Sequence, residues 1–584
     1  TGAGAGDITF ASTIDGTTAD TEALTLAAGT GAVTLQGAVG GTTPLASLDI
    51  TGGAVTVEQT VDVGGLMEVT NSALFTTLST ADIVADGGFT QNGTGSNSLG
   101  ADITTTDSNI SFDTAVVLTD AVTLDTGAGA GDITFASTID GTTANTETLN
   151  LTAGTGNVDL QDAVGGLTPL DSLVINSANN VDLLAVTAGT ITQIAGSGIT
   201  TIGGVLTSNV GDIDIANNQI VQNANILSAG EVSLDASADI ALDAGLISAN
   251  RLIHLIAGTG VMQDALGHGG LQATDLLLEG AGDFTLVTDA ANNLISNVAT
   301  VGTVAGVVTF ENDQALTVNA VDDATAVTSN GVSAETLLLS TTAGNLTVDQ
   351  NATATTGDLL LDAAGDLAIN NAVTATAGNA SLIAGGAITQ AAAGDVSVAG
   401  NLDVEAGGAI TMNADASSTS TGSGNIRYLS TVGDITLGLL NAGTGNVRVQ
   451  ALSGNIVDGR AALNNVTAAN LQLLASGNVG AAGAGALDVD VDTLAAQATT
   501  GNIYISEADT LNLTTVADFN VTRIGLDSSA TPTAVGALSN VLAGNHVKIE
   551  TVANGLTVTD TVTATGGDLL LDAAGDLAIN NAVT

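Results

Sequence analysis

The stretch GDLLLDAAGDLAINNAVT, residues 357–374, contains the pattern that decides the fold, and it returns unchanged as residues 567–584. In each half of the stretch, a glycine and a polar residue precede a short run of mostly alternating aliphatic and small or polar residues. A period of two residues is typical of a half-buried β-strand. Glycine, Asn and Asp supply the backbone conformations that tight turns require. The stretch therefore predicts short strands joined by tight turns.

The same turn-and-strand unit recurs about every ten residues, as in GAITQ at Gly386, GDVSV at Gly394 and GNVRV at Gly445. Strands this short fit either an array of β-sandwiches or a β-solenoid. The turns are too short for sandwich crossovers, and Val, Leu, Ile and Ala have the size that fills a narrow coil. The sequence predicts an all-β parallel β-helix (β-solenoid) with roughly 20–25 residues per coil. About 25 coils at about 4.8 Å each would form a rod of about 120 Å.

Longer repeats overlie this short period. Residues 1–125 and 126–250 are related units, and their similarity is strongest in 1–50 and 126–175, where TGAGAGDITFASTIDGTTA occurs twice. Residues 346–374 and 556–584 form a second related pair. Such duplications are typical of repeat arrays. We interpret residues 1–584 as one continuous solenoid segment of a longer protein.

The charge of the chain excludes several classes of partner. Only 6 Lys and Arg residues stand against 60 Asp and Glu residues, which gives a formal net charge of −54. Proteins that bind nucleic acid or anionic lipid need basic patches, so we expect neither partner. No apolar run is long enough for a membrane helix, which predicts no membrane insertion in this segment. The absence of cysteine fits a protein that is exported before it folds.

Three stretches carry a resemblance to a known family: GDITFASTIDG (Gly6–Gly16), TLAAGTGAVTLQGAVGGTTPLASLDI (Thr25–Ile50) and the segment Gly477–Asp509. In these stretches the chain resembles the filamentous-haemagglutinin-like exoproteins of bacterial two-partner secretion and giant surface adhesins with similar β-strand repeats. The resemblance implies a right-handed parallel β-helix, export across the outer membrane, and a role in adhesion, biofilm or surface structure. It implies an extracellular or cell-surface location.

Catalytic patterns are sparse in the sequence. The three His residues lack the paired spacing of zinc sites, and the single Lys, Lys548, follows no phosphate-binding loop. A carbohydrate-active β-helix would need converging carboxylates and aromatic platforms. Arg427, Arg448 and Arg460 recur near the coil period beside Tyr428, which suggests a small basic stripe. We interpret these arginines as ion-pair partners for Asp434 or Asp458, and we expect no enzyme activity.

Calcium is the one cofactor that the sequence suggests, because stacked Asp-rich turns offer the hard oxygen ligands that this ion prefers. Asp7 and Asp132 occupy equivalent positions in the repeated GAGAGDITF and are the candidate ligands. The alternative is that both are solvated turn residues. Asn pairs pose a similar choice between a side-chain ladder along the coil axis and simple turn preference; the pairs begin at Asn179, Asn217, Asn292, Asn370, Asn464 and Asn580.

These observations favour a structural or adhesive extracellular scaffold, a rod that holds a binding tip or neighbouring chains away from a cell. One alternative is a self-assembling subunit of an extracellular filament or sheath, since open coil ends offer unpaired backbone groups. Another is a carbohydrate-active β-helix. The expected partners are further copies of the chain, associated laterally or end to end, or the surface of a host or neighbouring cell.

Overall fold

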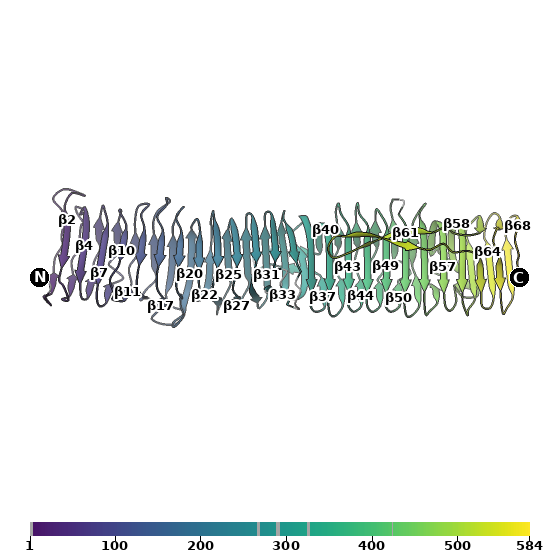
Figure 1. Cartoon of the computed structure of the whole chain (residues 1–584), viewed down its shortest axis with the longest axis horizontal. Coiled ribbons are helices and arrows are strands. Elements are labelled where there is room, and N and C mark those ends of the chain that lie inside the picture. Colours follow the sequence, from purple (N-terminus) through teal and green to yellow (C-terminus); the bar gives the residue numbers. More distant parts are fainter. Residues whose placement is uncertain (1–3, 265–268, 288–291, 324–327, 423) are drawn as a thin grey trace. The chain divides into compact units, whose positions relative to one another are not determined.

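The computed structural model describes residues 4–264, 269–287, 292–323, 328–422 and 424–584. It divides into two compact units, residues 1–274 and 275–584, and each is built of stacked parallel strands (Figure 1). The chain makes about 25 turns of β-solenoid, which confirms the predicted fold class and coil number. The helical element of the described residues is a short 3-10 turn, Gly483–Gly485. None of the helical structure in the described ranges is long and apolar enough to cross a membrane.

Each coil contributes three strands to three walls. In unit 1, β7 (Met67–Asn71), β8 (Phe75–Thr77) and β9 (Ile83–Ala85) make one coil. The next coil places β10 (Phe89–Gln91), β11 (Asn97–Leu99) and β12 (Ile103–Thr104) on them in the same order, all parallel. Buried and more exposed side chains alternate along β7 and β8, as the period of two predicts.

One wall of unit 1 runs through twelve strands in continuous register. Successive partners in this wall lie between 19 residues apart, as Val181 and Thr200, and 25 residues apart, as Ile133 and Val158. At about 4.8 Å per strand the wall is about 50 Å long. Its strands are β2 (Ala23–Ala27), β4 (Ser47–Gly52), β7, β10, β13 (Ile110–Phe112), β16 (Ile133–Phe135), β19 (Val158–Leu160), β21 (Val181–Leu183), β23 (Ile199–Ile202), β26 (Gln219–Gln222), β29 (Asp239–Leu242) and β32 (Gly260–Gln263).

The corresponding wall of unit 2 positions the candidate site. From Leu337 to Leu494 its paired residues lie 21 to 24 residues apart. Its strands are β34 (Asp283–Leu286), β36 (Val304–Asn312), β40 (Val332–Thr341), β43 (Leu359–Ala363), β46 (Ala380–Ala384), β49 (Leu402–Ala406), β52 (Ile426–Ser430), β55 (Asn446–Ala451), β57 (Val466–Ala475), β58 (Leu487–Ala498) and β63 (Val541–Ala543).

The core of each unit consists of inward Val, Leu, Ile and Ala side chains, most of them fully buried. Burial of one such aliphatic side chain contributes about 1.5–3 kcal/mol, so the repeated core drives folding. In unit 1 the rings of Phe89, Phe112 and Phe135 stack along the axis, with successive ring centroids 5.2 Å apart. Aromatic bulk therefore adds to the thin aliphatic core where a coil is wide enough to hold a ring.

The turns of the duplicated stretches are alike in the described residues 4–50 and 129–175. Gly40 and Gly165 both have positive φ, 72° and 67°, and a Cβ atom on either would lie 2.0 Å from a backbone oxygen of the next coil. Asp20 and Asn145 share the same left-handed backbone conformation. The repeat therefore preserves the residues that its turns require.

Asparagine ladders run along the solenoid, as the sequence suggested. Asn379 donates from its backbone and side-chain nitrogens to Asp358 Oδ1, at 2.7 and 2.9 Å, and its own Oδ1 accepts the backbone N–H of Asn401 at 2.9 Å. Asn425 and Asn446 continue this ladder. The residues of this ladder directly follow turn glycines. The predicted pair Asn179–Asn180 also takes part in a ladder, because Asn180 donates its backbone and side-chain nitrogens to Asn157 Oδ1 at 3.2 and 2.9 Å. Asn371, from one predicted pair, accepts the N–H of Ala372 in the ordinary turn role.

Candidate functional site

One coil of unit 2 carries an insertion that forms a β-hairpin. Ile503 pairs with Val547, 44 residues further on, where neighbouring coils need about half that number. The extra residues form β61 (Phe519–Ile524) and β62 (Ala530–Val535), an antiparallel pair. We call residues 516–538 the arm. Figure 1 shows its yellow-green ribbon running across the strands of the unit 2 wall, from β58 toward β40.

The arm lies on one row of outward side chains, which we call the arm seat. Strand register places these residues directly one above another along the wall. Outward positions of the solenoid are mostly small and polar, but the seat is apolar at one end and charged in the middle. The arm seat consists of Leu338, Leu360, Ser381, Asp403, Arg427, Arg448 and Gln472.

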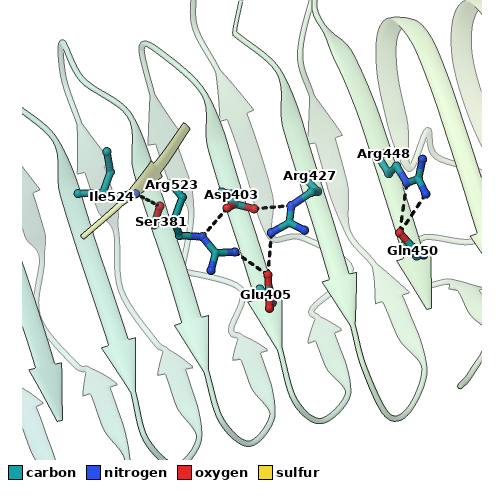
Figure 2. Close-up of polar contacts among 8 residues, drawn as sticks. All are labelled: Ser381, Asp403, Glu405, Arg427, Arg448, Gln450, Arg523 and Ile524. Carbon is teal, nitrogen blue, oxygen red and sulfur yellow. Dashed lines mark hydrogen bonds and ion pairs between the residues drawn. The ribbon is translucent and has the colours of Figure 1, made fainter. Parts of the chain in front are cut away.

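Two arginines bind the same two carboxylates at the centre of the seat (Figure 2). Arg523 of β61 donates from Nε to Asp403 Oδ2 at 2.7 Å and from Nη2 to Glu405 Oε2 at 2.5 Å. Arg427 of β52 donates to Asp403 Oδ1 and to Glu405 Oε2, both at 2.7 Å. Because Asp403 is completely buried, these charge-assisted bonds compensate for the lost hydration of its carboxylate.

The same contacts change the acidity of the carboxylate next to Asp403. Burial alone would raise the pKa of Glu405, but hydrogen bonds from Arg523 and Arg427 outweigh burial and hold that pKa below its usual range. Burial likewise opposes the charge on Arg523, and its two carboxylate partners reverse the effect and raise the pKa of the guanidinium. Glu405 and Arg523 therefore both stay charged at neutral pH.

Apolar contacts and backbone hydrogen bonds hold the rest of the arm. Toward its tip, Ile524 packs on Leu338 and Leu360, which are 0% and 1% exposed. The backbone N–H of Ile524 donates to Ser381 Oγ at 2.9 Å. At its base, Val516 and Leu538 pack on Ala495 of the wall. The arm thus spans a series of consecutive coils, each of which pairs only with its direct neighbours.

Two of the three residues of the predicted basic stripe, Arg427 and Arg448, stack on one another, and Arg460 lies after β56 (Ile456–Asp458) on another wall. Arg427 and Arg448 are paired neighbours on adjacent strands, and the prediction that Asp434 or Asp458 would be their ion-pair partner is wrong for Arg427, which binds Asp403 and Glu405. Arg448 donates to Gln450, Gln472 and the arm carbonyl of Gly536. Arg460 contacts Asp458 only through its backbone N–H, and its guanidinium donates to the carbonyl of Asn464.

Tyr428 offers no platform for a sugar ring. Its side chain is 1% exposed, and its hydroxyl donates to Ser418 Oγ at 2.6 Å inside the coil. Burial raises the pKa of this phenol, so the hydroxyl stays protonated. Tyr428 is a core residue that fills a wide coil beside the arm seat.

The two candidate calcium ligands lie at equivalent turns. Asp7 Oδ1 accepts the backbone N–H of Ala32 at 2.8 Å, and Asp132 Oδ1 accepts the backbone and side-chain nitrogens of Asn157 at 2.8 and 2.9 Å. Each carboxylate therefore joins its coil to the next one. The calcium site at Asp7 and Asp132 stays a prediction.

A different group of carboxylates lies closer together. Among the described residues, one set of three or more possible metal ligands has its ligand atoms within 4.8 Å of one another, and it consists of Asp490, Glu507 and Asp509. Glu507 is fully buried and accepts backbone N–H groups, including that of Val491 at 3.2 Å. Burial, with the nearby Asp490 charge adding to it, raises the pKa of Glu507 to about 8. A hard cation is the ligand that such a group suits.

Sequence reasoning missed both the arm and this cluster. The doubled spacing between Ile503 and Val547 is the signal that marks the inserted hairpin. The clustering of Asp490 with Glu507 depends on how two neighbouring coils pack, and no local sequence motif predicts it.

Comparison with protein-family models, with curated proteins and with solved structures finds no match to this chain. The resemblance to filamentous-haemagglutinin-like exoproteins therefore rests on the repeat residues quoted above, and it stays a prediction.

Proposed function

We propose that this chain is a structural or adhesive scaffold segment of a secreted bacterial surface protein, and that its function is reach. The observation that carries the proposal is the repetition of one short aliphatic coil, with outward side chains that are mainly small, polar or acidic. Such an arrangement lengthens by about 4.8 Å with every coil. In repeat proteins stability is close to a sum of the repeats and their interfaces, so reach grows without a larger core.

The arm supports the same proposal. A solenoid coil contacts only its two neighbours, so local opening can begin at any weak interface. The arm joins coils from β36 to β58 through Arg523, Ile524 and its base at Val516. A tie of this kind resists separation of coils, which is useful in a segment that transmits force or holds a tip at a distance. The role that we propose for the arm is mechanical, without a catalytic step.

Scattering and imaging of the purified chain test the proposed reach. The coil number and the strand spacing give a length of about 120 Å. We expect small-angle X-ray scattering and negative-stain electron microscopy to report an elongated particle of this length. A compact sphere would refute the proposal. Antibody labelling of intact, unpermeabilised source cells tests the proposed location. Labelling that requires permeabilised cells would contradict an extracellular role.

A further inference from the structure

A groove lies in unit 2 where the arm ends. It has a volume of about 530 Å³ and lies between Leu526, Asp527 and Ser528 at the arm tip and the outer faces of β34 and β36. Its volume is within the range of protein ligand sites. Two of its residues, Thr285 and Thr309, pair with each other, and Thr309 pairs with Leu338 of the arm seat. The groove therefore continues the row on which the arm lies.

The groove combines an apolar surface with negative charge. Val287, Val307 and Leu526 contribute aliphatic surface, and Asp283 and Asp527 contribute carboxylates from opposite sides. Asp283 Oδ1 accepts the backbone N–H of Val307 at 2.8 Å, which fixes its orientation. Hydrogen bonds from the hydroxyl and backbone N–H of Ser529 hold the pKa of Asp527 below its usual range, so this group is charged at neutral pH. No Lys or Arg is among the lining residues.

The arm shows what this face of the solenoid binds. Its strand β61 places Arg523 between two carboxylates of the wall and places the next residue, Ile524, on the outward leucines of the arm seat. The arm seat therefore binds a basic residue that is followed by an aliphatic one. The groove offers the same two features, carboxylates and aliphatic surface, on the next two coils of the same row.

We propose that the groove at the arm tip binds an extended segment of a partner protein that presents a Lys or Arg beside an aliphatic residue. The cationic head would lie between Asp283 and Asp527, and its aliphatic neighbour would pack on Val307 and Leu526. The net charge of −54 attracts basic partners from a distance. This docking site is independent of the proposed reach, since a rod of any length would present it.

Peptide binding to the full chain tests the proposal. The probes are fluorescein-labelled Val-Arg-Val and Val-Lys-Val peptides with blocked termini, and the control probe is Val-Gln-Val. Fluorescence anisotropy should show the two basic peptides binding at least tenfold more tightly than the neutral one. The Asp283→Asn, Asp527→Asn double variant should lose at least tenfold in affinity for the basic peptides. A matched variant, Asp243→Asn with Asp415→Asn, removes the same charge at exposed turns and should retain affinity within about twofold.

Hydrogen exchange locates the bound peptide independently of affinity. A saturating Val-Arg-Val peptide should slow amide exchange in β34, β36 and the arm tip, and far-UV circular dichroism should show that each variant keeps its β-sheet fold. Equal affinity for the neutral peptide would overturn the proposal, and so would an equal loss in the matched variant, which would indicate nonspecific attraction. Spermidine that competes as well as the basic peptides at equal concentration would identify a small-cation site instead of a protein-docking site.

Discussion

Removal of the Arg523 side chain tests whether the arm is held by its ion network. In an Arg523→Ala variant, the arm loses one bond of 2.7 Å to Asp403 and one of 2.5 Å to Glu405. A hydrogen bond to a charged group contributes about 1.5–3 kcal/mol. Removing one partner of a buried ion pair costs more when it leaves an unpaired charge. Here Arg427 still binds both carboxylates, and the Arg523 side chain is 28% exposed, so we expect a loss of about 2 kcal/mol.

The loss should appear as local opening of the arm, because the solenoid coils beneath it keep their own pairing. A change of about 2 kcal/mol corresponds to about thirtyfold faster amide exchange in β61 and β62. Hydrogen exchange followed by mass spectrometry measures this rate in peptides of the arm. Arg523→Lys keeps the charge but loses the forked geometry, so its exchange rate should be intermediate.

An Arg251→Ala variant, which removes the ion pair with Glu231 in unit 1, is the control and should leave arm exchange unchanged. Unchanged exchange in Arg523→Ala would refute the argument that the charged centre of the seat holds the arm. Equal acceleration in strands throughout unit 2 would refute it in another way, since the arm would then be inseparable from the folding of the wall.

Two further predictions concern the rest of the chain. Because the pKa of Glu507 is raised to about 8, the folded state binds more protons than the unfolded state between about pH 4.5 and 8. The contribution of Glu507 to stability is therefore greatest below this pH range and is lost as the pH rises through 8. Glu507→Gln should make the urea midpoint at pH 8.5 higher than that of wild type. Asn478 Oδ1 accepts two nitrogens of Asn502 at 2.9 and 3.0 Å, so Asn478→Ala should cost about 1–2 kcal/mol in denaturant titrations, whereas Asn478→Asp, which keeps the acceptor, should cost clearly less.

The fold was predictable because the same local sequence pattern recurs from coil to coil. A turn glycine, a polar residue such as Asp358 or Asn379, and a short aliphatic run predict one strand, and the regular spacing predicts how strands stack. The polar residue after the glycine also makes the ladder contact to the next coil. Local pattern and three-dimensional register therefore carry the same information, which is why a single sequence was enough for the solenoid.

The arm was not predictable from the same pattern. Its strands, FNVTRI in β61 and ATPTAV in β62, alternate apolar and polar residues as wall strands do, so the period of two cannot separate a surface hairpin from a wall strand. The ion-pair partner of Arg427 was predicted wrongly for a related reason. Arg427 is nearer in sequence to Asp434 than to Asp403, but stacking brings residues one coil apart into contact, and Asp403 is its register partner.

The burial of an outward leucine depends on the segment that lies over it. Leu360 of β43 is 1% exposed under the arm, whereas Leu542 of β63, an outward leucine on the same wall, is 42% exposed. An outward leucine in a solvated wall therefore offers apolar surface that another segment of the chain can cover. Outward leucines and arginines, rather than inward ones, are consequently the residues through which a solenoid of this kind encodes its non-local contacts. The same reasoning identifies the groove beyond the arm tip, where aliphatic and acidic residues share an outward face.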